Sequence, residues 1–149
     1  MDGFSPQHAG AKSLDLATFT IGGAAYGIDI FIIQEINKLL ELTPVPGALP
    51  YVQGILNLRG QIVTVIDLGL KLGLRNTHLN EQGRNIIVRS RGEYIGLLVE
   101  QISDVVRVDV NELESPPANM NGVQGEFFHG IIKTEDRLIG ILDVEKALD

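Results

Sequence analysis

The residues of this chain that could do chemistry are few and widely spaced. Its three histidines, His8, His78 and His129, lie far apart, and none has a second histidine or an acid at metal-ligand spacing. The chain has no cysteine, which excludes thiolate nucleophiles, disulfides and thiolate zinc sites. Glycine-rich phosphate loops and the Gly-x-Ser-x-Gly nucleophile turn are also absent. The sequence therefore predicts no metal site, no cofactor and no catalytic nucleophile.

One hairpin offers the best remaining enzymatic arrangement. His129 stands on its first strand, and Glu135 and Asp136 are in its turn, which suggests an acid/base group. Turn acids beside a histidine at a strand edge are, however, an ordinary structural pattern. We therefore expect no enzyme, and a small enzyme that uses His129 and Asp136 is the least favoured alternative.

Two segments carry charged side chains in an otherwise apolar setting. In Asn57-Leu58-Arg59-Gly60 a guanidinium with five donors stands at a predicted turn, and in Ile32-Ile33-Gln34-Glu35-Ile36 apolar residues surround a Gln-Glu pair. An apolar groove with one arginine and one glutamate suits protein binding, because arginine is enriched at interface hot spots. Alternatively, Arg59 and Glu35 simply form a surface ion pair of little energetic value. The residues alone leave both interpretations open.

Composition indicates the framework that must position these segments. The chain has 149 residues and a net charge of −7, and its 44% apolar content can build a core without disulfides. Ile (17) and Val (12) outnumber the 8 aromatic residues, which favours β structure. An acidic chain without a Lys/Arg run is poorly suited to nucleic acid, and no apolar run approaches the roughly 18 residues of a membrane span. Partners of these two kinds are not expected.

Turn residues and apolar runs predict four hairpins. Residues 1–13 lack periodicity and are expected to form a flexible N-terminal tail, and residues 31–42 mix helical and extended spacing. Asp67 and Asp143 are expected to cap two short helical segments, 68–72 and 144–148. The predicted hairpins are 14–21 with 24–30, 54–58 with 61–67, 85–89 with 94–99, and 127–133 with 137–143; a further strand is predicted at 104–110, and loops at 44–50, 75–84 and 116–124.

The two halves of the chain repeat one pattern. Residues 54–68 align without a gap with residues 130–144, 76 positions later, and residues 27–36 align with 96–105, 69 positions later. Two matched blocks in the same order indicate two versions of one small β unit. Chance similarity between β-rich segments is the alternative explanation.

These segments resemble the family of bacterial chemotaxis coupling proteins, the CheW family, in which the Asn-Leu-Arg-Gly turn is the most specific element. The matching segments occur in family order over residues 14–148: Tyr26-Gly-Ile-Asp-Ile30, Ile33-Gln-Glu-Ile36, Tyr51-Val-Gln-Gly54 after a proline-rich loop, Asn57-Leu-Arg-Gly60, Val65-Ile-Asp-Leu68, Gly96-Leu-Leu-Val-Glu100, Ser103-Asp-Val105 and Asp136-Arg-Leu-Ile-Gly-Ile-Leu-Asp143.

The resemblance implies a mainly β fold of two packed five-stranded Src-homology-3-like β-barrels with short helical turns. We expect one CheW-like domain over residues 14–149, with subdomains at roughly 14–80 and 81–149; exchange of a terminal strand between them is compatible with this division. The implied role is that of a non-catalytic cytoplasmic adaptor without a cofactor. Its implied partners are the regulatory domain of the chemotaxis histidine kinase and the cytoplasmic hairpin tip of chemoreceptors, in arrays at the membrane that involve no direct insertion of the adaptor.

The resemblance also implies which residues contact these partners. Ile86 and Ile102 would line a groove, Gly54 and Gly96 would permit close backbone approach, and Arg59 with Glu35 would orient polar contacts. The receptor would bind as a helix in the groove, with Arg59 setting its register, and the kinase would contact the barrel ends. The full expected set is Ile33, Glu35, Gly54, Asn57, Arg59, Ile86, Gly96, Ile102 and Val105.

Two related roles stay open at this stage. The same unit occurs as the regulatory domain of the kinase and beside a receiver domain in a longer adaptor. The end of this chain at Asp149, directly after the last predicted helical turn, favours a free-standing adaptor. An adaptor of a related pathway, such as surface motility, is the alternative.

Overall fold

The computed structural model describes residues 12–38, 41–74 and 79–149. Of the predicted tail, only Lys12 and Ser13 fall within these ranges. His8 and His78 lie outside them. The elements are β1 (Ser13–Ile21), β2 (Ala24–Asp29), the 3-10 turn η1 (Ile30–Ile32), β3 (Ile33–Lys38), β4 (Val52–Leu58), β5 (Gln61–Asp67), α1 (Leu68–Lys71), β6 (Arg84–Ser90), β7 (Glu93–Val99), β8 (Gln101–Asp109), η2 (Val110–Glu112), β9 (Asn119–Met120), β10 (Val123–Gln124), η3 (Gly125–Phe127), β11 (Phe128–Lys133), β12 (Leu138–Leu142) and α2 (Val144–Leu148).

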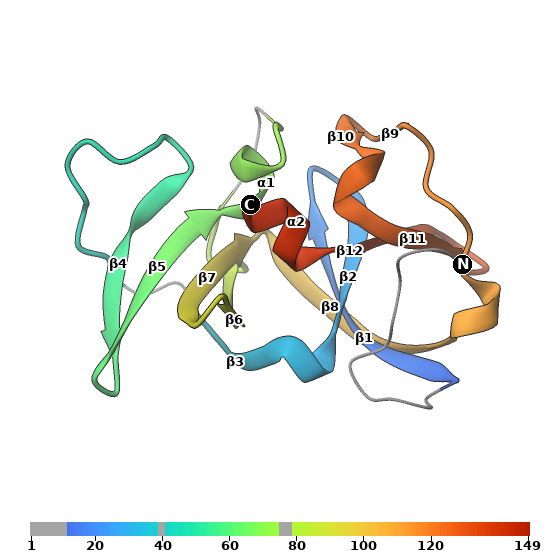
Figure 1. Ribbon diagram of the computed structural model, residues 1–149, viewed down its shortest axis with the longest axis horizontal. Coiled ribbons are helices and arrows are strands. Elements are labelled where there is room, and N and C mark those ends of the chain that lie inside the picture. The colour runs from blue at the N-terminus through green and yellow to red at the C-terminus, as the bar shows by residue number, and fades with distance from the viewer. Residues whose placement is uncertain (1–11, 39–40, 75–78) are drawn as a thin grey trace.

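Two five-stranded sheets form the body of the molecule, which confirms the mainly β prediction. The first sheet has the order β11-β12-β2-β1-β8, and the second has the order β3-β6-β7-β5-β4. The sheets lie side by side along the long axis, with α1 and α2 close to their junction (Figure 1). All four predicted hairpins form. The undecided segment 31–42 begins in the 3-10 turn η1 and continues as β3, and its residues 39–40 lie outside the described ranges.

The sequence repeat is visible in the strand order. In the alignment, β1 and β2 correspond to β6 and β7, β3 corresponds to β8, and β4 and β5 correspond to β11 and β12. Given in reverse, the order of the second sheet is β4-β5-β7-β6-β3, which matches β11-β12-β2-β1-β8 strand by strand. In each repeat the first two strands lie in one sheet and the last three lie in the other, so each sheet combines two strands of one repeat with three of the other. Each sheet takes strands from both halves of the chain. The predicted subdomain boundary between residues 80 and 81 therefore does not coincide with a division between the sheets, and it stays a prediction.

The register follows the same two offsets that the alignment uses. Ile139 lies opposite Ala25 in the parallel pair β12 and β2, and the matching residues Val63 and Tyr94 lie opposite each other in β5 and β7. The irregularity between Val52 and Gly54 in β4 also recurs, between Phe128 and Gly130 in β11. Chance similarity would not produce the same pairing, so the internal repeat is structural.

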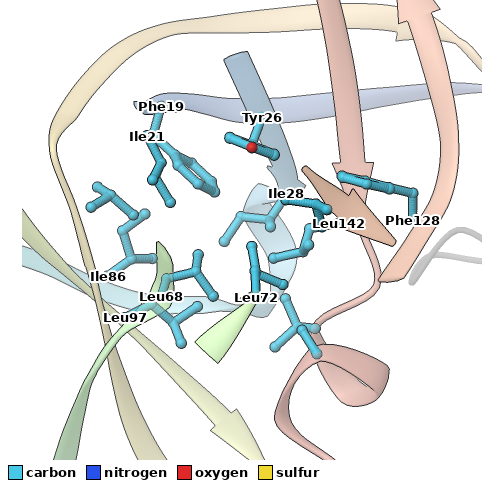
Figure 2. Packing of buried hydrophobic residues seen from close by; sticks show 14 of the residues in the cluster. Phe19, Ile21, Tyr26, Ile28, Leu68, Leu72, Ile86, Leu97, Phe128 and Leu142 are labelled. Atoms are coloured by element: carbon cyan, nitrogen blue, oxygen red, sulfur yellow. The ribbon is translucent and has the colours of Figure 1, made fainter. Parts of the chain in front are cut away.

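A shared apolar core joins the two sheets. Tyr26 stacks between Phe19 and Phe128, with ring centroids 5.9 and 6.0 Å apart, and Ile86, Leu68 and other aliphatic side chains pack around them (Figure 2). Each sheet also encloses a smaller cluster of its own. These inner clusters contain Leu14, Leu16, Ala25, Val108, Ile132, Ile139 and Ile141 in the first sheet, and Leu56, Val63, Val65, Ile87 and Leu98 in the second.

Both predicted helix caps are present. Asp67 accepts a hydrogen bond from the backbone N–H of Leu70 at 3.2 Å, and Asp143 accepts one from Lys146 at 3.1 Å. The predicted loop at residues 116–124 contains the short strands β9 and β10, which the Pro-Pro pair and the glycine concealed.

Candidate functional site

An ion pair joins the two outer strands of the second sheet. Arg59 lies in the turn between β4 and β5, and its Nη2 donates to Oε1 of Glu35 on β3. Asn57 supports this turn, because its Oδ1 accepts a hydrogen bond from the N–H of Gly60 at 2.9 Å. Arg59 and Gly60 both have a positive φ, of 50° and 84°, as a tight two-residue hairpin turn requires. The two segments that the sequence singled out therefore meet.

Glu35 owes its direction to a bulge. The pairing of β3 with β6 shifts between Ile33, which lies opposite Val88, and Glu35, which lies opposite Ile87. Glu35 and Asn37 therefore share the sheet face of Ile87, whereas Ile33 packs against the shared core. Asn37 Nδ2 donates to the second carboxylate oxygen of Glu35 at 3.0 Å. The hydrogen bonds from Arg59 and then from Asn37 hold the pKa of Glu35 below its ordinary value, so this carboxylate is ionised at neutral pH.

A surface hollow of about 240 Å³ surrounds the ion pair. Its walls combine the charged pair with the aromatic ring of Tyr94 and aliphatic groups, which is a mixture suited to protein contact. Ile36 and Ile62, which neighbour Glu35 and Gln61 in the sequence, are both exposed, at 40% and 57%. The residues that line the hollow are Gln34, Glu35, Leu58, Arg59, Gln61, Val63, Ile87 and Tyr94.

Three predicted apolar contact residues reach the surface to different degrees. Ile33 and Ile102 are half-buried and pack against the shared core from equivalent places in the repeat. Val105 on β8 is 63% exposed, and it pairs with Ala17 at the outer edge of the first sheet. The structure places Ile33 in the strand that holds Glu35, whereas Ile102 and Val105 belong to the other sheet.

Three other predicted residues lie inside the protein. Ile86 is completely buried in the shared core, so its side chain does not line a surface groove as expected (Figure 2). A Cβ at Gly54 would lie 2.7 Å from the carbonyl oxygen of Thr43, and a Cβ at Gly96 would collide with the Asn85 amide. Both glycines therefore make room for parts of this chain itself.

The enzymatic alternative fails on geometry. His129 lies at the start of β11, whereas Asp136 is in the turn at the far end of that hairpin, about four residues or roughly 13 Å along the strand. The acid beside His129 is Asp143 instead, with Nδ1 and Oδ2 3.6 Å apart. Burial lowers the pKa of His129, and the charge of Asp143 partly opposes this. Among the described residues, no group of three histidines, cysteines or acids could hold a metal ion.

Comparison with known proteins decides the family. The CheW-like domain family matches residues 15–149. The chain belongs to the CheW-like family. It is 31% identical to the chemotaxis protein CheW of Treponema pallidum over 145 residues, covering 95% of this chain and 85% of that protein. It is 34% identical to the chemotaxis protein CheW of Bacillus subtilis over 134 residues, covering 90% and 86%.

A solved structure extends the match to three dimensions. The crystal structure of the scaffolding protein TtCheW from Thermoanaerobacter tengcongensis superposes with a TM-score of 0.85 and 31% identity, covering 98% of this chain and 94% of that one. The CheW-like fold expected from the sequence is therefore confirmed, and the chain belongs to a family of non-catalytic scaffold proteins. Within the described part of the chain, no helix is long and apolar enough to cross a membrane.

Sequence reasoning missed two polar residues of this CheW-like site. Asn37 stands two positions after Glu35, so the alternation of a strand could have indicated it once residues 33–38 were known to be extended. Asn85 lies opposite Asn37 on β6 and gave no signal, because only the pairing register brings it close.

Proposed function

We propose that this CheW-like chain is a cytoplasmic adaptor that couples the cytoplasmic tips of chemoreceptors to the regulatory domain of the chemotaxis histidine kinase. The observation that carries the proposal is the exposed Glu35–Arg59 pair, which links the turn after β4 to β3 at the two ends of the second sheet. Its two charges come from segments that the family resemblance marks for partner contact, and the structure brings them together.

The exposure of this pair supports a role in binding. The side chain of Arg59 is 73% exposed, and an exposed ion pair contributes little to folding. The guanidinium therefore retains free donors that a partner's carboxylate or carbonyl groups can accept. Exposed Ile36, next to Glu35, and exposed Ile62, on β5 after the turn, supply apolar area, so burial can drive association while Arg59 fixes the orientation.

Val105 and Ile102 mark a second contact region on the first sheet. They occupy repeat positions that correspond to Ile36 and Ile33. Two contact regions on different sheets suit an adaptor, because each can hold one partner while the other stays accessible. Receptor tips are antiparallel helical hairpins in the implied family, and an apolar surface of this kind fits the apolar face of such a helix.

The chain offers a matched control for testing the role of Arg59. Arg107 on β8 is equally exposed, at 74%, and it binds Asp15 through its Nε at 2.8 Å and its Nη2 at 3.1 Å. Arg59→Ala and Arg107→Ala thus remove one guanidinium and one exposed ion pair each, from different sheets.

The experiment is a titration of the isotope-labelled chain with a receptor hairpin fragment and with a kinase regulatory domain, followed by amide shifts. We expect Arg59→Ala to weaken binding of at least one partner by on the order of tenfold or more with an unchanged fold, and Arg107→Ala to change it little. Equal losses for both variants would overturn the site, and no shifts with either partner would overturn the function.

A further inference from the structure

A row of amide side chains crosses the inner face of the second sheet behind Glu35. Asn37 on β3 lies directly opposite Asn85 on β6, and Asn85 is 2% exposed. Asn85 extends into the space that Gly96 on β7 leaves open, where any Cβ would collide with it. The row thus runs from the interior of the sheet to the carboxylate at its edge.

Asn37 and Arg59 divide the carboxylate of Glu35 between them. Asn37 Nδ2 donates to Oε2 at 3.0 Å, and Arg59 Nη2 donates to Oε1. Each carboxylate oxygen therefore accepts a hydrogen bond from a different side chain. Arg59 is a long and exposed side chain, whereas Asn37 is short, half-buried and fixed by the strand. Of the two donors, Asn37 is the one that can hold the carboxylate in place before Arg59 reaches it.

The amides weaken the sheet in other respects. Neither Oδ1 of Asn37 nor Oδ1 of Asn85 accepts a hydrogen bond from any residue that the structure describes, and both atoms are buried. A buried polar atom without a partner destabilises a fold. An aliphatic pair would suit this position better for stability alone.

The repeat shows what such an aliphatic pair looks like. In the first sheet the positions that match Asn85 and Asn37 hold Leu16 and Val106, which face each other across β1 and β8. The positions that match Glu35 and Arg59 hold Asp104 and Glu135, two acids that cannot form the ion pair. The amides and the ion pair are therefore present together in one sheet and missing together from the other.

We infer that Asn37, supported by Asn85, is a positioning residue that holds Glu35 in the orientation required by Arg59 for partner binding. This inference rests on the proposed function of the Glu35–Arg59 site. Asn37 acts through Glu35 and makes no contact with the partner in this account.

The first test uses no partner and so stands independently of the proposed function. The pKa of the Glu35 carboxyl is measured by NMR in the wild type, in Asn37→Val, in Asn37→Ala and in the control Gln124→Ala, an exposed amide on β10 that does not line the hollow. Asn37→Val places there the residue type of the matching position, so we expect the fold to be retained. The pKa of Glu35 should rise in both Asn37 variants and stay unchanged in the control. An unchanged pKa in folded Asn37 variants would overturn the inference.

The second test is a double-mutant cycle on partner binding. Asn37→Val should weaken binding by roughly two- to tenfold, as expected for one hydrogen bond, and should have no further effect in a Glu35→Ala background. Losses that add would show that Asn37 acts otherwise than through Glu35, which would overturn the inference. If the wild type binds neither partner, the proposed function fails, while the pKa measurement still decides the role of Asn37.

Discussion

At the residue scale, Glu35 should make the stability of the fold depend on pH. The pKa of Glu35 is lower in the folded protein than its ordinary value of 4.5. A carboxylate of this kind stabilises the fold above its unfolded pKa, and its contribution is lost as the pH falls through the folded pKa. Glu35→Gln should therefore be less stable than the wild type near neutral pH, and the difference should disappear in acid.

Chemical denaturation of both proteins at about pH 7 and at an acid pH below the folded pKa of Glu35, as found by NMR titration, measures this difference. Gln124→Ala serves as the control, because Gln124 is uncharged, exposed and outside the hollow. A gap between wild type and Glu35→Gln that persists in acid would mean that the ionised carboxylate is not its source.

The sequence anticipated this site only in part, for reasons that differ between residues. Arg59 and Glu35 were found because charged side chains stood out in apolar segments. Asn37 was missed because the sequence left open whether residues 31–42 are extended, and only an extended strand places Asn37 on the same face as Glu35. Gly54 and Ile86 were expected to contact partners because the resemblance identifies matching positions in the sequence. It does not say whether the residue at such a position contacts a partner or packs inside the protein.

At the scale of elements, the repeated aspartates Asp67 and Asp143 begin the two short helices. Each accepts a hydrogen bond from the third residue after it, which satisfies a backbone donor that the helix cannot. Asp67→Ala and Asp143→Ala should each cost about 0.5–2 kcal/mol of stability, whereas Asn at either place can still accept this bond. Thermal unfolding measures the effect, and an equal cost for Asn and Ala would argue against capping.

Gly54 fixes the path of β4 against the preceding segment. Its φ is +150°, and an added Cβ would lie 2.7 Å from the carbonyl oxygen of Thr43, which bridges to Ile55. Gly54→Ala should therefore destabilise the protein by about 1–3 kcal/mol. Partner binding should fall along with the melting temperature, in contrast to Arg59→Ala, which should leave that temperature nearly unchanged. A stable Gly54→Ala variant with impaired binding would instead indicate direct contact with a partner.

Hairpins were predicted well because their signals are local. Gly22-Gly23, Gly60 and Gly92 have positive φ in the turns, where glycine relieves the backbone. The segment after Asp29 was ambiguous because it changes from a 3-10 turn to β3 within a few residues. Its extended form depends on pairing with β6, about fifty residues further along the chain.

At the scale of the whole molecule, each repeat contributes strands to both sheets, and this sharing joins the two sheets into one structure. Neither repeat can complete a five-stranded sheet from its own strands, and the shared core contains residues of both sheets. We therefore expect both sheets to unfold in a single cooperative transition. The offsets of 76 and 69 residues indicated a duplication, but the strand exchange was beyond them because an alignment does not say which sheet a strand joins.

A truncation in one inner cluster tests this cooperativity. Leu16→Ala, in the first sheet, should cost about 2–5 kcal/mol. The slowest-exchanging amides of the second sheet should lose protection by the same free energy as those of the first. Loss of protection confined to the first sheet would show that the sheets unfold separately.

The coupling role itself is tested most directly by a retention assay. A receptor hairpin fragment is immobilised, and the retention of a kinase regulatory domain is measured with and without this chain. We predict that the kinase domain is retained only when the chain is present, that Arg59→Ala reduces this retention, and that Arg107→Ala does not. Retention that is independent of the chain, or a chain that binds the receptor fragment and never retains the kinase domain, would contradict the account.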